Sequence, residues 1–190
     1  MYLGGDGVSE ATLTLLYGDA NPSGKLAETF PLRLEDNPSY LSFPGENGVS
    51  EYREGIFVGY RYYDKKKMDV RFPFGHGLSY TTFDWELMPA ADTAITDPFQ
   101  KLSTQVKVTN TGDVAGKEVV QVYANPPYTK GGIEKTSANL VGFAKTDLLQ
   151  PGQSQTVTVD WVAQDMASYD WNDANANGYT GYELEAGDYV

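Results

Sequence analysis

Residues 108–127 read VTNTGDVAGKEVVQVYANPP and combine two strand patterns with a turn pattern. Asn110–Asp113 is rich in residues that tolerate turn conformations. Glu118–Ala124 then alternates polar and apolar side chains until Asn125–Pro127 interrupts it. Period-two alternation places successive side chains on opposite faces of a strand, so that one face is buried and the other meets water. This stretch therefore predicts a strand, a turn and a second strand in a half-buried sheet.

The same pattern recurs through the rest of residues 100–190. The segments expected to form further strands are Leu102–Val108, Asn139–Lys145, Val157–Trp161, Tyr182–Glu185 and Asp188–Val190. Short strands separated by turn residues at this spacing are typical of an immunoglobulin-like or fibronectin type III-like β-sandwich. The last strand only begins near the end of the sequence, so we expect it to be truncated.

Residues 1–85 follow a different pattern. Val8–Leu16 carries apolar residues at helical spacing and predicts one short helix. Lys25–Phe30 and Ile56–Tyr63, which reads IFVGYRYY, predict strands. We expect this part to be a short α/β remnant with one helix and few strands.

Composition also divides the chain in two. All four arginines and 15 of the 25 aromatic residues lie in residues 1–85. Residues 86–99 include Pro and Asp-Pro turn signals and are predicted to be a linker, with the β-sandwich at 100–190. The fold expected for the whole chain is therefore mainly β.

Charge and cysteine content exclude several classes of function. Lys and Arg total 14 against 26 Asp and Glu, giving a net charge of −12, which repels nucleic acid and anionic membranes. No run approaches the roughly 18 apolar residues of a membrane span. The absence of cysteine excludes disulfides, zinc–thiolate sites and cysteine nucleophiles.

Glu51, Arg53 and Glu54 form a polar cluster before the IFVGYRYY segment. Two carboxylates held about 5–10 Å apart can act as acid and base in glycoside hydrolysis, and that would make the chain an autonomous enzyme. An ion pair that braces a loop between domains is the interpretation we favour. The three residues are kept as candidates for the rim of a substrate site.

Aromatic side chains crowd the segment that follows. Period-two tyrosines can form a sugar-stacking platform, but they more often pack in a sheet or an interface. We therefore predict that the large rings of this segment pack the two parts of the chain together. These rings are Tyr60, Tyr62, Tyr63, Phe72 and Phe74.

Residues 173–178 read DANANG and match the first six positions of a calcium-binding loop. Asp173, Asn175 and Asn177 offer hard oxygen ligands at alternate positions, and Gly178 permits the sharp bend. The twelfth position is Leu184 instead of the bidentate glutamate of such loops. Calcium binding and a purely polar Asn-Gly turn both remain open.

Three segments together resemble one protein family. GDANPSGKLAETFP (18–31), SEYREGIFVGYRYYD (50–64) and RFPFGHGLSYTTFDW (71–85) are similar to the closing segment of the α/β-sandwich domain of family 3 glycoside hydrolases, the β-glucosidase and β-xylosidase family. Residues 108–127 and LLQPGQSQTVTV (148–159) resemble the fibronectin type III-like domain that follows it in those enzymes. The resemblance covers nearly the whole chain.

The resemblance implies a retaining two-carboxylate mechanism for the parent enzyme. In the family, an aspartate of a (β/α)₈ barrel attacks the sugar, and a glutamate of the sandwich domain protonates the leaving oxygen. The barrel is absent here, and the usual motif of the glutamate, a Glu-rich segment leading to Gly-x-Asp-Arg, does not occur in this sequence. Tyr169–Trp171 and Phe83–Trp85 echo the nucleophile motif, which has Ser or Thr before Asp-Trp, but we interpret this as coincidence, so no catalytic residue is carried over. The expected role is non-catalytic support within a β-glucosidase-like hydrolase of β-linked glucosides. A carbohydrate- or calcium-binding sandwich module is the alternative.

The resemblance also implies partners and a source. The missing barrel and the rest of the α/β-sandwich domain are the expected partners, with a homo-oligomer as a further possibility. The ending YDWNDANANGYTGYELEAGDY (169–189) is closest to that of anaerobic bacterial members. For a bacterial protein with no signal-peptide pattern at its first residues, we expect a cytoplasmic location.

Overall fold

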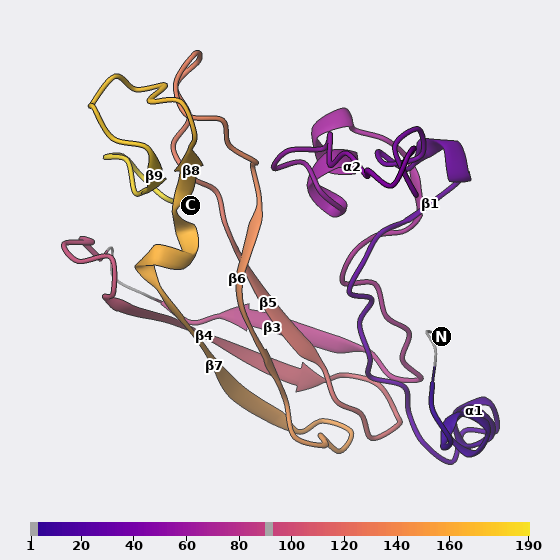
Figure 1. The fold of residues 1–190 in the computed structure, drawn as a ribbon. Coiled ribbons are helices and arrows are strands. Elements are labelled where there is room, and N and C mark those ends of the chain that lie inside the picture. Colours follow the sequence, from indigo (N-terminus) through magenta and orange to yellow (C-terminus); the bar gives the residue numbers. More distant parts are fainter. Residues whose placement is uncertain (1–3, 90–92) are drawn as a thin grey trace.

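The computed structural model describes residues 4–89 and 93–190, and confirms a mainly β fold with a small helical part (Figure 1). The elements of the first part lie along one side of the sandwich (Figure 1). They are α1 (Val8–Leu16), β1 (Phe30–Pro31), the 3₁₀ helix η1 (Leu34–Asp36), α2 (Tyr60–Lys66) and β2 (Val70–Phe72). The sandwich part contains β3 (Phe83–Leu87), β4 (Lys101–Asn110), β5 (Val119–Ala124), β6 (Asn139–Lys145), β7 (Ser154–Val162), the 3₁₀ helix η2 (Ala163–Met166), β8 (Ser168–Asp170) and β9 (Gly181–Glu183).

Antiparallel pairing builds the sandwich from small sheets. One sheet has the order β3-β4-β7, a second consists of β5 and β6, and β8 pairs with β9. The alternating apolar residues meet between the first two sheets, as the sequence predicted. The buried members of this core are Val106, Val108, Val120, Leu149, Val157 and Val159.

The strands expected at Leu102–Val108, Glu118–Ala124, Asn139–Lys145 and Val157–Trp161 are confirmed as β4 to β7. Strand β3 was not predicted. It overlaps the first two residues of the expected linker and pairs with β4 from Phe83 opposite Asn110 to Leu87 opposite Val106.

The strand expected at Asp188–Val190 is not formed. Only Val190 pairs, exchanging two backbone hydrogen bonds with Asn125, at N···O distances of 2.6 and 3.0 Å. The next residues along the partner segment are Pro126 and Pro127, which have no N–H to donate, so the pairing cannot extend in that direction.

The prediction of a strand at Ile56–Tyr63 was wrong, because Tyr60–Lys66 forms the helix α2. Gly59 precedes this helix with φ 61° and ψ −135°, a conformation outside the strand region that glycine adopts readily. Helical spacing then places Tyr60 and Tyr63 on one face, where a strand would have paired Tyr60 with Tyr62. Residues 4–89 therefore contain two α-helices, where one was expected.

The expected strand Lys25–Phe30 is also mostly absent, since only Phe30 and Pro31 form β1. The segment lies against the glycine-bent loop that follows β2. Leu26 donates to the carbonyl of His76 and accepts from the N–H of Gly75, both at 2.8 Å. Gly75 has φ 79°, so this partner is bent and a regular ladder cannot continue along it.

Helix α1 confirms the predicted Val8–Leu16 element, but its apolar face is only partly covered. None of its residues is buried, and Leu16 is 72% exposed. No helix within residues 4–89 and 93–190 is long and apolar enough to cross a membrane.

Candidate functional site: the joint between the two parts

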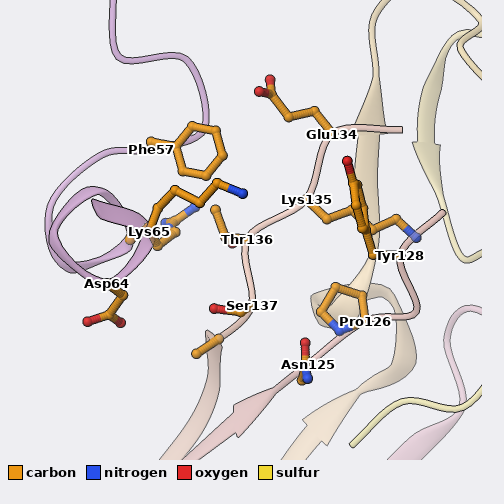
Figure 2. Close-up of a pocket in the computed structure, with 12 residues that line it drawn as sticks. Phe57, Asp64, Lys65, Asn125, Pro126, Tyr128, Glu134, Lys135, Thr136 and Ser137 are labelled. Carbon is orange, nitrogen blue, oxygen red and sulfur yellow. The ribbon is translucent and has the colours of Figure 1, made fainter. Parts of the chain in front are cut away.

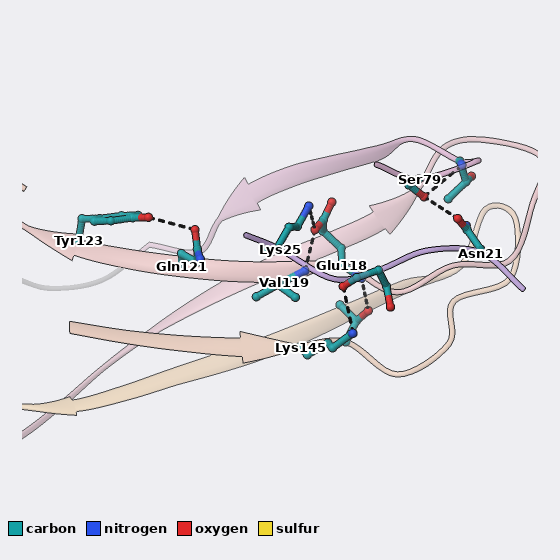
Figure 3. Close-up of polar contacts among 11 residues, drawn as sticks. Asn21, Lys25, Ser79, Glu118, Val119, Gln121, Tyr123 and Lys145 are labelled. Atoms are coloured by element: carbon teal, nitrogen blue, oxygen red, sulfur yellow. Dashed lines mark hydrogen bonds and ion pairs between the residues drawn. The ribbon is translucent and has the colours of Figure 1, made fainter. Parts of the chain in front are cut away.

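Polar contacts join the first part to the start of the sandwich (Figure 3). Lys25 lies 2.7 Å from Glu118 in an ion pair whose side chains are only 22% and 12% exposed. The Lys145 ammonium donates to the Ser23 carbonyl at 3.0 Å. Each contact links residues more than 90 positions apart, so together they fix the orientation of the two parts.

Asn21 bridges three separate segments in the same joint. Its side-chain nitrogen donates to the Ala115 carbonyl at 3.1 Å, and its oxygen accepts from the Tyr80 N–H at 2.8 Å and from the Ser79 hydroxyl at 3.1 Å. The amide nitrogen therefore holds the first part onto the loop before β5, and the amide oxygen ties Asn21 to residues 79–80 just before β3.

The aromatic half of the joint is centred on Tyr60. Its ring lies 4.7 Å from the Phe74 ring and 6.0 Å, edge to face, from the Tyr123 ring of β5. Its hydroxyl accepts a hydrogen bond from the Leu140 N–H of β6 at 3.0 Å. The pairing of β5 with β6 shifts register between Val122 and Tyr123. Tyr60 therefore contacts the sheet at the point where its hydrogen-bond ladder is irregular.

Burial at this joint changes the chemistry of Tyr123. Burial raises the pKa of the Tyr123 hydroxyl, and the neighbouring Tyr60 and Asp64 raise it further.

The Tyr123 hydroxyl donates to Gln121 at 3.0 Å, and Gly75 lies so close to the Gln121 side chain that a Cβ at position 75 would collide with its amide oxygen. The glycine of the aromatic loop thus permits its close approach to β5.

The other aromatic residues predicted to pack the joint lie at different places. Phe74 is in the joint, as described. Tyr63 is buried and meets Tyr62 edge to face within α2, at 5.4 Å between ring centroids. Phe72 packs within the first part, against Phe30 at 6.4 Å and His76 at 5.0 Å.

The three residues of the polar cluster, Glu51, Arg53 and Glu54, are only partly linked to one another. Arg53 donates from Nε to the Glu51 carboxylate at 2.6 Å, and both side chains are well exposed. Glu54 is partly buried, and its Oε2 has no hydrogen-bond partner among residues 4–89 and 93–190. Glu51 is thus already paired, and no contact brings it to Glu54.

A cavity of about 260 Å³ opens between α2 and the segment that follows β5 (Figure 2). Its lining carries both signs of charge, including Arg61, Lys65 and Glu134. Lys135 also contributes, but its buried ammonium already bonds the Pro127 carbonyl at 2.6 Å and the Glu185 carboxylate at 2.5 Å. These bonds leave Lys135 a structural role at the edge of the cavity.

The candidate calcium loop, residues 173–178, forms hydrogen bonds within itself and to Glu183. Asp173 accepts from the N–H groups of Asn177 and Gly178, at 2.8 and 3.0 Å. Asn175 and Asn177 donate from their amide nitrogens to one oxygen of Glu183, at 3.0 and 2.7 Å. A cation needs oxygens at that point, so both amides would have to turn before calcium could bind.

Asp170 anchors this loop by accepting hydrogen bonds from its backbone N–H groups. The carboxylate is buried and accepts from the N–H groups of Asn172 and Ala174, at 3.1 and 2.8 Å. Burial raises the pKa of the Asp170 carboxyl, but the hydrogen bonds from backbone N–H groups outweigh it and hold the pKa below its ordinary value.

We expect Asp170 to stabilise the fold above its unfolded-state pKa of about 4, and this stability to be lost as the pH falls through the lower folded-state value. The melting temperature, measured from pH about 6 to about 2, should therefore fall less steeply with decreasing pH in Asp170→Asn than in the parent chain. Asp113→Asn, in an exposed turn, is the control and should keep the parent slope. Equal slopes for all three proteins would contradict this assignment.

Comparison with known proteins covers both parts of the chain. Residues 1–80 match the model of the glycosyl hydrolase family 3 C-terminal domain, and residues 118–190 match that of the fibronectin type III-like domain. The thermostable β-glucosidase B of Acetivibrio thermocellus is 46% identical over 176 residues, which span 90% of this chain and 23% of that protein. The probable β-glucosidase I of Aspergillus clavatus is 45% identical over 175 residues, spanning 90% of this chain and 20% of the relative.

Solved structures agree with these matches. A β-glucosidase from Paenibacillus barengoltzii superposes with a TM-score of 0.81 at 44% identity, covering 94% of this chain and 19% of that one. β-Glucosidase 3B from Thermotoga neapolitana gives a TM-score of 0.79 at 40% identity, covering 98% and 24%. The chain thus spans about a fifth to a quarter of the length of these relatives. Residues 1–80 thus belong to the family 3 glycosyl hydrolase C-terminal domain family, and residues 118–190 belong to the fibronectin type III-like domain family.

Proposed function

We propose that this chain is the non-catalytic supporting part of a β-glucosidase-like retaining hydrolase of β-linked glucosides. The Tyr60 joint carries this proposal, because it fastens the fibronectin type III-like sandwich to the family 3 C-terminal part by packing and hydrogen bonding together. The relatives named as β-glucosidases are four to five times longer, which leaves room for a catalytic barrel outside this region.

Exposed apolar residues of the first part support the same proposal. Leu41 is 90% exposed, Phe43 74% and Tyr52 89%, and no residue of α1 is fully buried. Large exposed apolar areas usually mark contact surfaces. The rest of the α/β domain and the (β/α)₈ barrel are the partners proposed for them.

The purified chain should not hydrolyse a chromogenic aryl β-glucoside above the buffer blank. Retaining hydrolysis needs two carboxyl groups about 5–5.5 Å apart with one free to attack, whereas Glu51 is bound by Arg53. Reproducible turnover that is lost in Glu51→Gln or Glu54→Gln would contradict the proposal. Turnover unchanged in both variants would indicate a contaminating enzyme and is checked by repurification.

An exposed aromatic surface favours carbohydrate binding as a second candidate function. Tyr169 and Tyr182 lie opposite each other on β8 and β9, with ring centroids 5.0 Å apart, and are 50% and 66% exposed. Trp171 follows β8 and is 71% exposed, and the Tyr179 ring lies against Gly181. Exposed flat rings of this kind offer an apolar face and polar tips to a sugar.

Calorimetric titration with cellotetraose tests this second function, and titration with calcium chloride tests the loop beside it. If the aromatic surface binds sugar, heat with cellotetraose should be lost in Trp171→Ala and kept in Tyr128→Ala, an exposed aromatic elsewhere. No heat with cellotetraose would remove the sugar-binding function. No heat with calcium would leave residues 173–178 as a polar turn.

A further inference from the structure

The cavity between α2 and the segment that follows β5 contains a guanidinium whose charge no neighbour balances. Arg61 of α2 lines this cavity and is partly buried. Among the described residues its guanidinium forms no ion pair and one hydrogen bond, from Nη1 to the Ile56 carbonyl at 3.5 Å, and its buried Nε has no partner. The Tyr60 ring, 5.8 Å from the guanidinium carbon, provides only a cation–π contact. A guanidinium has five N–H donors, and a partly buried charge without a counter-ion is unfavourable, so this wall of the cavity lacks an anion.

Lys65 brings a second cation to the same cavity. It follows Arg61 by four residues in α2, and residues at this spacing share a face of a helix, where like charges repel each other. The Lys65 ammonium lies 5.8 Å from the centre of the Phe57 ring and forms no ion pair with a described residue. Figure 2 shows this ammonium directed across the cavity toward residues 134–137, and the Asp64 carboxylate of the same helix directed away from them. An anion in the cavity would therefore relieve the repulsion between the two cations.

The opposite wall of the cavity is fixed in place and offers a free hydroxyl. Lys135 and Thr136 are buried there, with the Lys135 ammonium paired to Glu185 and the Thr136 hydroxyl donating to the Asn139 side chain at 2.6 Å. Ser137 is exposed, and its hydroxyl forms no hydrogen bond within residues 4–89 and 93–190. Figure 2 shows this hydroxyl on the side of its segment that faces α2. The wall therefore places a third donor opposite the two cations.

We propose that this cavity binds a small oxyanion, the phosphoryl or carboxylate group of a ligand of metabolite size, between Arg61 and Lys65 on one wall and Ser137 on the other. The oxygens of such a group accept charge-assisted hydrogen bonds from a guanidinium and an ammonium at once. The volume of about 260 Å³ is close to that of the smallest small-molecule sites, about 300 Å³. Because the two cations belong to the first part and Ser137 to the sandwich, the bound anion bridges the joint. The proposal does not depend on any catalytic assignment.

Glu134 allows the sign of the ligand's charge to be tested. Its exposed side chain lines the same cavity and forms no ion pair with a described residue. By Coulomb's law its carboxylate repels a bound anion and attracts a bound cation. Glu134→Gln should therefore strengthen the binding of an anion by about twofold, whereas it would weaken the binding of a cation.

Isothermal titration calorimetry of the whole chain with sodium phosphate, and separately with sodium glucuronate, tests the proposal at an ionic strength held constant with sodium chloride. We expect saturable heat with at least one anion, with an affinity that falls about tenfold in Arg61→Gln and about threefold in Ser137→Ala. Lys66→Gln is the matched control, because Lys66 lies in α2 but does not line the cavity, and it should change the affinity by less than about twofold. Heat with phosphate alone assigns the site to a phosphoryl group, heat with glucuronate alone assigns it to a carboxylate, and heat with both supports their shared chemistry.

Ser137→Ala keeps the test decisive if Arg61→Gln does not fold, because it removes only an exposed hydroxyl. The proposal would be overturned by the absence of saturable heat with both anions. Equal affinities of the parent chain, Arg61→Gln and Ser137→Ala would also overturn it, and so would weaker binding of the anion in Glu134→Gln.

Discussion

The rest of this structure depends on the contact that Tyr60 makes with the sandwich. One side chain packs on Phe74 of its own part and on Tyr123 of β5, and its hydroxyl accepts the Leu140 N–H of β6. A fully buried backbone N–H left without a partner costs about 1–3 kcal/mol, and the Leu140 N–H is partly buried, so the Tyr60 hydroxyl contributes as well as the ring. The ion pair of Lys25 with Glu118 and the bridge made by Asn21 hold the other end of the same joint.

The β-sandwich could be predicted because its signal is local. Alternation in segments such as Glu118–Ala124 fixes which face is buried whatever lies elsewhere in the chain. The helix α2 could not be predicted in this way, because IFVGYRYY combines β-forming residues with an alternation that also fits a strand. The backbone turn at Gly59 and the packing of Tyr60 on β5 outweigh that local preference.

The joint was predicted only in part, for a similar reason. A concentration of rings in the segment containing Tyr60 and Phe74 indicated packing, but nothing local distinguishes these two from Phe72, which packs within the first part. The partners Glu118 and Leu140 are 93 and 80 positions from Lys25 and Tyr60, so no spacing rule identifies them. Pairing of Arg53 with Glu51 was foreseeable because only two positions separate them.

The central claim is that Tyr60 makes the two parts one cooperative unit, and scanning calorimetry tests it most directly. The account predicts one transition for the parent chain, with equal calorimetric and van't Hoff enthalpies, and two separated transitions for Tyr60→Ala. Tyr52→Ala, at an exposed tyrosine of the same part, should keep the single transition. Two transitions in the parent chain, or a single cooperative one in Tyr60→Ala, would contradict the account.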